Sequence, residues 1–153
     1  MVASWADEPV LVQVKRSGRL ASLEKSLGPS AAGVVDYTTD CRTLAELIEQ
    51  SMQAEITEEL GLEPEEYELT PLAYAREIFR GERPQLFTMA TTELSAEDVA
   101  ERLRRLPAEG REFSEVTFVP LEQSRERRTR RLAALNHEAR MNWYMIEEYL
   151  ASC

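Results

Sequence analysis

Apolar and polar residues alternate with helical spacing along residues 43–62, which we predict to form one long helix. Thr43 and Glu46 have the spacing of a capping box, and Gly61 stands where such a helix would end. The side expected to face the core carries Leu44, Leu47, Ile48, Ser51 and Met52. The opposite side, expected to face solvent, carries Glu46, Glu49, Gln50, Gln53 and Thr57.

Three carboxylates interrupt this pattern in the second half of the helix. Glu55, Glu58 and Glu59 fall on the same side as the apolar residues of the first half, and Leu62 returns to that side after them. Like charges three and four residues apart repel one another on a helix. Clustered glutamates are commonly a solvated acidic face, but the solvent side of this helix lies elsewhere. A hard divalent cation with oxygen ligands, Mg²⁺ or Mn²⁺, is the simplest counter-charge.

The remaining pattern predicts strands on both sides of this helix. Residues 10–15 read as a strand, and residues 17–30 as a loop. Residues 1–9 are expected to be too short for a full preceding strand. After a turn at 64–66, residues 68–80 and 84–93 are predicted to pair as a hairpin around 81–83. Residues 95–98 form a second capping box, which opens a helix that Pro107 ends.

The last third of the chain alternates once more and then becomes helical. Residues 113–120 have the period of a strand, and residues 121–152 are helical in character. The apolar stripe of this tail is Ala139, Trp143, Ile146 and Leu150. A strand–loop–helix–hairpin–helix–strand–helix order predicts an α+β fold.

Composition narrows the class of protein. A length of 153 residues predicts a single domain, and 43% hydrophobic residues are enough for a sizeable core. The net charge of −10 argues against general nucleic-acid binding, but it is compatible with a metal–phosphate complex. Cys41 and Cys153 make neither a disulfide framework nor a metal motif. With no signal peptide and no apolar run long enough for a bilayer, we expect a cytoplasmic protein that is not membrane-bound.

The acidic stretch resembles a known family. Residues 54–62, Ala-Glu-Ile-Thr-Glu-Glu-Leu-Gly-Leu, are similar to the second half of the Nudix box, G-x5-E-x7-R-E-U-x-E-E-x-G-U with U aliphatic. Ala54 stands where the motif has its arginine, and Glu46 has the spacing of the upstream glutamate of the motif. Asp40 stands where the first glycine would fall. Gly33, seven residues earlier in Ser-Ala-Ala-Gly-Val-Val-Asp (30–36), is the better match and requires a lengthened loop.

The resemblance implies a fold and a set of site residues. It implies a Nudix-like α/β/α sandwich with a mixed sheet, formed by a single domain over residues 1–153. In the family these glutamates bind Mg²⁺ or Mn²⁺, so the implied ligands are Glu55, Glu58, Glu59 and a backbone carbonyl around Ala32–Gly33. Many members also place a carboxylate ahead of the last core strand. Glu112 matches that position best, with Glu115 second, and Glu59 and Glu112 are therefore the implied catalytic residues.

Other charged residues have two interpretations each. Arg76 and Arg80 have the spacing of one strand face and could bind substrate phosphates, or they could pair with surface acids. A basic run at Arg125, Arg127, Arg128, Arg130 and Arg131 fits a solvated helix face, with phosphate or nucleic-acid binding as the alternative. His137 is the only histidine, and the sequence assigns it no role.

Three functional hypotheses follow from the resemblance. The first is a Nudix-type, metal-dependent pyrophosphohydrolase that cleaves a diphosphate bond in a nucleoside-diphosphate-linked small molecule. The second is a binding or regulatory module with weakened turnover, which Ala54 and the lack of a glutamate at Thr39 favour. The third is an isopentenyl-diphosphate isomerase-like enzyme, but Ala32 and Val34 stand where those enzymes have cysteine and histidine. A homodimer is an open possibility, because a trimmed sheet would expose an edge.

Overall fold

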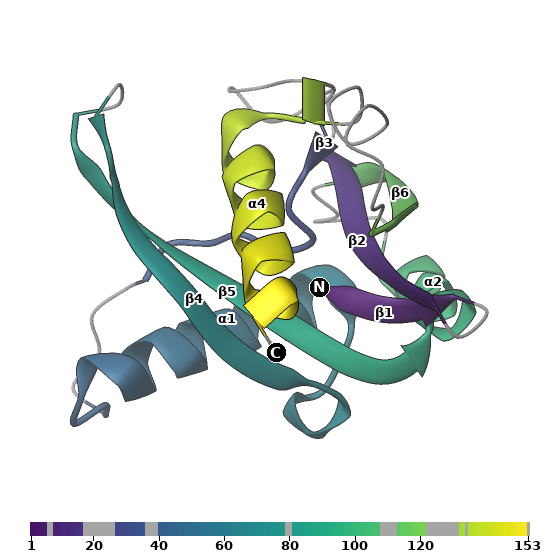
Figure 1. Ribbon diagram of the computed structural model, residues 1–153. Helices are drawn as coiled ribbons and strands as arrows, with labels where there is room; N and C mark the ends of the chain where they lie inside the picture. Colours follow the sequence, from purple (N-terminus) through teal and green to yellow (C-terminus); the bar gives the residue numbers. More distant parts are fainter. Residues whose placement is uncertain are drawn as a thin grey trace.

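The fold is a mixed β-sheet between helices. The computed structural model describes residues 1–5, 8–16, 27–35, 40–78, 81–107, 113–121, 132–133 and 135–152 (Figure 1). Within these residues six strands form one sheet: β1 (Val2–Trp5), β2 (Glu8–Arg16), β3 (Leu27–Gly28), β4 (Glu68–Glu77), β5 (Arg83–Ser95) and β6 (Phe113–Pro120). The helical elements are α1 (Leu44–Leu60), the 3-10 turn η1 (Pro64–Glu66), α2 (Ala96–Arg105) and α4 (His137–Ser152).

The strands are ordered β3-β2-β1-β5-β4, and β6 pairs with β2. The parallel pair is β1 with β5, whereas β1–β2, β2–β3, β2–β6 and β4–β5 are antiparallel. Residues 1–9 were expected to be too short for a full preceding strand, but Val2–Trp5 do form the four-residue strand β1. Val2 is opposite Leu11 of β2 on one side and Thr91 of β5 on the other. Two neighbouring strands thus stabilise a segment whose own sequence is too short to predict.

Both faces of the sheet are covered, which explains the nearly continuous apolar run in β2. Alternate residues Val10, Val12 and Val14 join the core beneath α1 and α2. Leu11, between them, packs instead with Trp143 and Ile146 of α4. Figure 1 shows α4 on one face of the sheet and α1 on the other. The predicted α/β/α sandwich is therefore confirmed.

Both predicted capping boxes are present. Thr43 caps α1 and exchanges hydrogen bonds with Glu46, and Ser95 does the same with Asp98 at α2. The hairpin, the strand at 113–120 and the turn at 64–66 are also confirmed. In α4, Ala139, Trp143 and Ile146 are buried as expected, but Leu150, near the end of the helix, is exposed. Among the described residues, the helices lack the length and apolar character needed to cross a membrane.

The core contacts of α1 begin later than the sequence pattern predicts. Leu44 was expected to face the core, yet 68% of it is exposed, and Leu47, Ile48 and Met52 are only partly buried. The fully buried residues are Ile56, Leu60 and, just after the helix, Leu62. The second half of α1, which carries the acids, is therefore the half that is fixed by packing.

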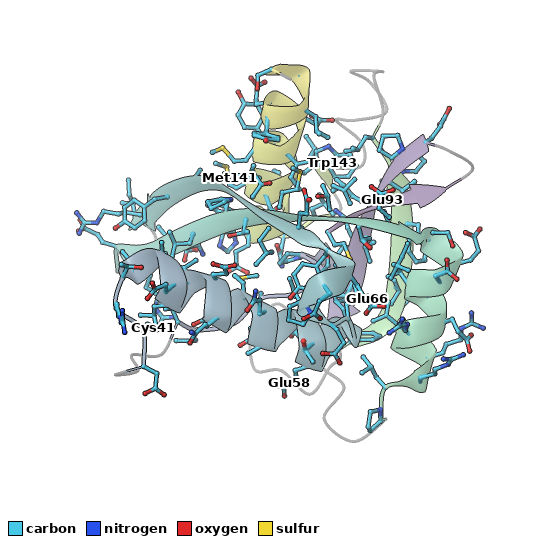
Figure 2. The ribbon with its side chains drawn as sticks, turned by 90° about the horizontal axis from the view of Figure 1, so that it is seen from below. Cys41, Glu58, Glu66, Glu93, Met141 and Trp143 are labelled. Atoms are coloured by element: carbon cyan, nitrogen blue, oxygen red, sulfur yellow. The ribbon has the colours of Figure 1, made fainter. Side chains whose placement is uncertain are left out.

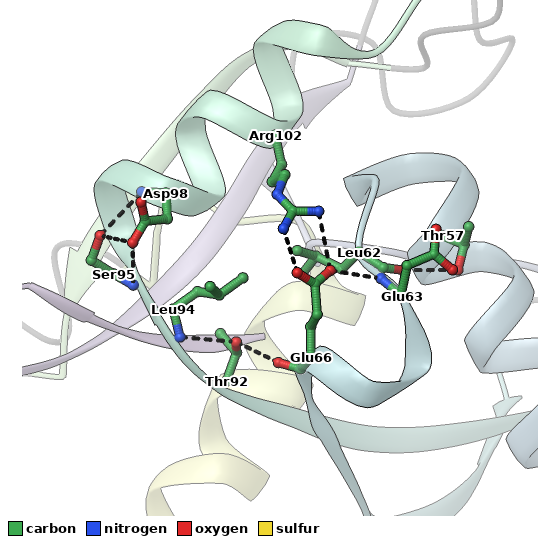
Figure 3. A network of polar contacts seen from close by, with 9 residues as sticks. All are labelled: Thr57, Leu62, Glu63, Glu66, Thr92, Leu94, Ser95, Asp98 and Arg102. Carbon is green, nitrogen blue, oxygen red and sulfur yellow. Dashed lines mark hydrogen bonds and ion pairs between the residues drawn. The ribbon is translucent and has the colours of Figure 1, made fainter.

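Polar contacts hold the C-terminal end of α1 (Figure 3). Gly61 takes the left-handed conformation, with φ +67°, and its N–H bonds the Thr57 carbonyl at 3.0 Å. The Thr57 hydroxyl donates to the Leu62 carbonyl at 2.8 Å. In the turn that follows, both terminal nitrogens of Arg102 donate hydrogen bonds to the Glu66 carboxylate. This pair fixes η1 to α2. These contacts set the position of the helix turn that carries Glu58 and Glu59.

We expect Gly61→Ala to destabilise the protein more than Gly81→Ala. Both glycines have left-handed backbones, at φ +67° and +76°, so each alanine costs about 1–2 kcal/mol of conformational strain. A Cβ on Gly61 would also meet Leu106 Cδ2 at 3.1 Å, whereas one on Gly81 would have no neighbour within 4 Å. Urea denaturation measures both free energies of unfolding. Equal losses would mean that Leu106 moves aside without cost.

Candidate functional site

The loop that faces α1 is anchored on the sheet. Ser30 is buried, and its hydroxyl donates to the Val12 carbonyl at 2.6 Å while accepting from the Met1 nitrogen at 2.7 Å. Val12 lies in the middle of β2, so this hydrogen bond ties the loop to a central strand. The residues that follow, Ala31 to Gly33, thereby reach the second half of α1.

Two of the three acids converge on this loop. The Ala32 N–H donates to Glu59 Oε2 at 2.9 Å. Gly33 lies so close to α1 that a Cβ added to it would overlap the Glu55 carboxylate. Glu55 and Glu59 are both partly buried and lie one helical turn apart. The structure therefore brings Gly33, Glu55 and Glu59 together, as the resemblance implied.

Glu58 departs from the expected arrangement. Its side chain is exposed, and Figure 2 shows it on the side of α1 away from the sheet. Consecutive helix residues differ by about 100° in direction, so Glu58 and Glu59 cannot both point at the loop squarely. The expectation that three carboxylates face the same way is wrong for Glu58.

Ala54, at the position of the family's arginine, is also exposed. It precedes Glu58 by four residues, and residues at this spacing are neighbours on a helix surface. An arginine at this position would stand beside Glu58. Position 54, which lacks the arginine of the family, and the exposed carboxylate of Glu58 therefore lie on the same side of α1.

The remaining predicted site residues are only partly described. Glu112, Arg80 and the basic run at 125–131 lie outside the described residues. Arg76 is exposed near the end of β4, where it forms an ion pair with Glu82 of the hairpin turn. Glu115 is exposed on β6 and pairs with Lys15 at 3.1 Å. The backbone group seen to contact an acid is the Ala32 N–H, and a carbonyl ligand near Gly33 stays a prediction.

A groove of about 910 Å³ runs along the first half of α1, between this helix and strands β4 and β5. It is lined mainly by apolar and aromatic side chains, among them Leu44, Ile48, Met52, Tyr67, Tyr74 and Leu86. Met52 precedes Glu55 by three residues, so the groove ends about one helical turn before the acids. Its volume is within the range of small-molecule sites, roughly 300–1,000 Å³.

Tyr67 lines this groove and has a polar group, its hydroxyl. Its hydroxyl is buried and has no hydrogen-bond partner within the part of the chain that the structure describes. Burial raises the pKa of Tyr67, and the carboxylates of Glu63, Glu65 and Glu49 raise it further, so the phenol stays protonated at neutral pH. The hydroxyl therefore remains a hydrogen-bond donor, although its oxygen is buried and not exposed to the groove in this structure.

Sequence reasoning missed one group of side chains whose donor atoms lie close enough together to hold a metal ion. Glu77, His137 and Glu138 place one donor atom each within 4.8 Å of one another. Glu77 ends a strand and the other two begin a helix much later, so the signal in the sequence was limited to an adjacent His–Glu pair. This group is on the α4 side of the sheet, opposite α1.

Comparison with solved structures identifies the fold. The NUDIX domain of Shewanella oneidensis NrtR, solved with ADP ribose, superposes with a TM-score of 0.61 at 15% identity, covering 97% of this chain and 82% of that domain. DR0079 from Deinococcus radiodurans gives a TM-score of 0.55 at 17% identity, covering 90% and 74%. No protein-family profile and no curated protein sequence matches this chain. The similarity to these proteins is therefore found by comparing structures and not by comparing sequences, and the chain has the Nudix fold.

Proposed function

We propose that this protein is a metal-dependent hydrolase that cleaves a diphosphate bond in a nucleoside-diphosphate-linked small molecule. The observation that carries the proposal is the convergence of Glu55 and Glu59 on the loop at Ala32 and Gly33. Two carboxylates one helical turn apart offer oxygen ligands to a divalent cation, and the proposal adds a backbone carbonyl of the loop near Gly33 as a third. The Nudix fold of the chain supports the same chemistry.

Each residue has a definite part in the proposed reaction. Bound Mg²⁺ or Mn²⁺ supplies Lewis-acid polarisation of phosphoryl oxygens and a water of lowered pKa. Glu55 and Glu59 would hold the cation, and Glu58 is the third candidate ligand. Glu112 is our candidate for the base that takes the proton of the attacking water. Arg76 and Arg80 are candidates for binding the outer phosphate oxygens.

The groove is the candidate binding site for the organic group attached to the diphosphate. Its aromatic and aliphatic lining suits a base or sugar, and it ends close to the acids. The NrtR domain was solved with ADP ribose, which is a nucleoside diphosphate joined to a second sugar. ADP-ribose is therefore the first compound to test.

The alternative is a binding module with the same site and little turnover. Two observations favour it: Ala54 leaves no arginine on α1, and Glu58 is exposed beside it. Both hypotheses predict metal and diphosphate binding, and they differ in the rate of cleavage.

Mg²⁺ should raise the melting temperature of the wild-type protein, and Gly33→Ala should weaken this effect. Metal bound only by the folded state adds about 2.7 kcal/mol when present at a hundred times its Kd. The Cβ that this substitution adds would displace the Glu55 carboxylate, while the backbone of Gly33 is outside the left-handed region that disfavours alanine. Differential scanning fluorimetry with and without millimolar Mg²⁺ measures the shift.

Two controls define this experiment. Glu59→Gln should also lose the Mg²⁺ shift, whereas Glu49→Gln, an exposed acid earlier in α1, should keep it. The metal-free melting temperature of Gly33→Ala should remain near that of the wild type. If Mg²⁺ does not raise the melting temperature of the wild type, the proposed metal site is refuted. If Gly33→Ala shows the same Mg²⁺ shift as the wild type, Gly33 is not part of the site.

The wild type should release product from ADP-ribose with Mg²⁺, and Glu112→Gln should lower kcat at least tenfold. A positioned general base contributes about 10²–10⁴-fold to the rate. Phosphate release after phosphatase treatment measures turnover, and Glu59→Gln serves as the inactive control. Tight binding of ADP-ribose without turnover would favour the binding module, and normal kcat in Glu112→Gln would exclude Glu112 as the base.

Ala54→Arg should raise kcat with little change in KM. The added guanidinium would lie four residues before Glu58 and could orient its carboxylate through an ion pair. A rise in kcat at constant KM means that the added ion pair stabilises the transition state more than it strengthens substrate binding. Ala54→Gln, similar in length and helix propensity but uncharged, is the matched control. An equal rise in both variants would show that the charge is irrelevant.

A further inference from the structure

We propose that Glu77, His137 and Glu138 form a second metal site, which binds a divalent transition metal of the zinc class. The site goes beyond the proposed hydrolase site and does not depend on it. Glu77 is the last residue of β4, and His137 and Glu138 are the first two residues of α4. Figure 1 shows α4 on the opposite face of the sheet from α1, so the two sites lie in different layers.

The carboxylates of Glu77 and Glu138 both approach the imidazole of His137. His137 Nε2 contacts Glu77 Oε1 at less than an ordinary hydrogen-bond distance. Glu138 Oε1 is 3.8 Å from the same nitrogen. In a tetrahedral zinc site with bonds of about 2.0–2.1 Å, neighbouring ligand atoms are about 3.3 Å apart. Small side-chain rotations would therefore bring these three atoms around one ion.

The surroundings hold two of these ligands in place. The Glu77 side chain is only 8% exposed, and its second oxygen accepts from Gln85 Nε2 at 3.3 Å. The start of α4 is fixed by Asn136, whose Oδ1 caps the Ala139 N–H at 2.8 Å and whose own N–H bonds the Leu27 carbonyl at 3.0 Å. A hydrogen bond that orients a ligating carboxylate, as Gln85 does for Glu77, is typical of metal sites.

The types of donor atom select the metal. Two carboxylate oxygens and one imidazole nitrogen make a mixed oxygen and nitrogen ligand set. A set with one nitrogen and two oxygens suits Zn²⁺, whereas Mg²⁺ favours oxygen ligands and its own waters. The His137 side chain is 46% exposed, so a fourth position is open to water. The metal would join the end of β4 to the start of α4.

The single histidine of the chain makes the test specific. We would record long-range ¹H–¹⁵N spectra of the imidazole in ¹⁵N-labelled protein without a histidine tag, and titrate with ZnCl₂. The expected result is a large change at Nε2, a smaller one at Nδ1, and saturation at one equivalent. Millimolar MgCl₂ should leave Nε2 unchanged. An Nε2 signal unaffected by a fivefold excess of Zn²⁺ would overturn the site and leave an ion pair alone.

Variants separate this site from the acids of α1. The double variant Glu55→Gln and Glu59→Gln should keep the full Nε2 response, and losing it would overturn the separate site. Glu77→Gln and Glu138→Gln should each weaken Zn²⁺ binding about tenfold or more by calorimetry. Glu148→Gln, an exposed acid on the same helix, should not. Equal affinity in all three single variants would contradict the proposal even if the imidazole signal moves.

Discussion

The candidate site depends on one short contact between a loop and a helix. Residues 30–33 bond to β2 at one end and approach α1 at the other, through Ser30 and Ala32 respectively. The loop therefore links a strand in the centre of the sheet to the acids of the helix. Gly33 makes the approach possible because any side chain there would occupy the space of the Glu55 carboxylate. Without this contact, Glu55 and Glu59 would be two acids on an ordinary surface helix.

The local features of the fold were predictable from the sequence because short-range chemistry determines them. The capping boxes at Thr43 and Ser95 and the left-handed Gly61 each depend on residues only a few positions apart. The box-like spacing of Glu55 and Glu59 predicted their direction for the same reason. The loop contact at Gly33 came from the family resemblance, and it required knowing that a lengthened loop returns to the helix.

The features that were missed depend on long-range packing. β1 is a strand because β2 and β5 lie on either side of it, which residues 2–5 alone cannot indicate. Leu44 has the right periodicity for a core residue, but the groove separates the first half of α1 from β4 and β5. Periodicity gives the direction of a side chain and not the distance to its neighbour. His137 likewise acquires the Glu77 carboxylate as a neighbour only when α4 packs beside the end of β4.

The pairing of β1 with β5 also has a consequence for folding. Val2 and Ser4 are opposite Thr91 and Ser95, so the first strand can pair with β5 only after more than half of the chain has been made. β2 similarly pairs with β6, whose residues follow the second helix. Contacts this distant in sequence slow folding, because loop-closure entropy must be overcome before they form. The β1–β2 and β4–β5 pairs join neighbouring segments and can form early, whereas the β1–β5 and β2–β6 pairs that complete the sheet must form later.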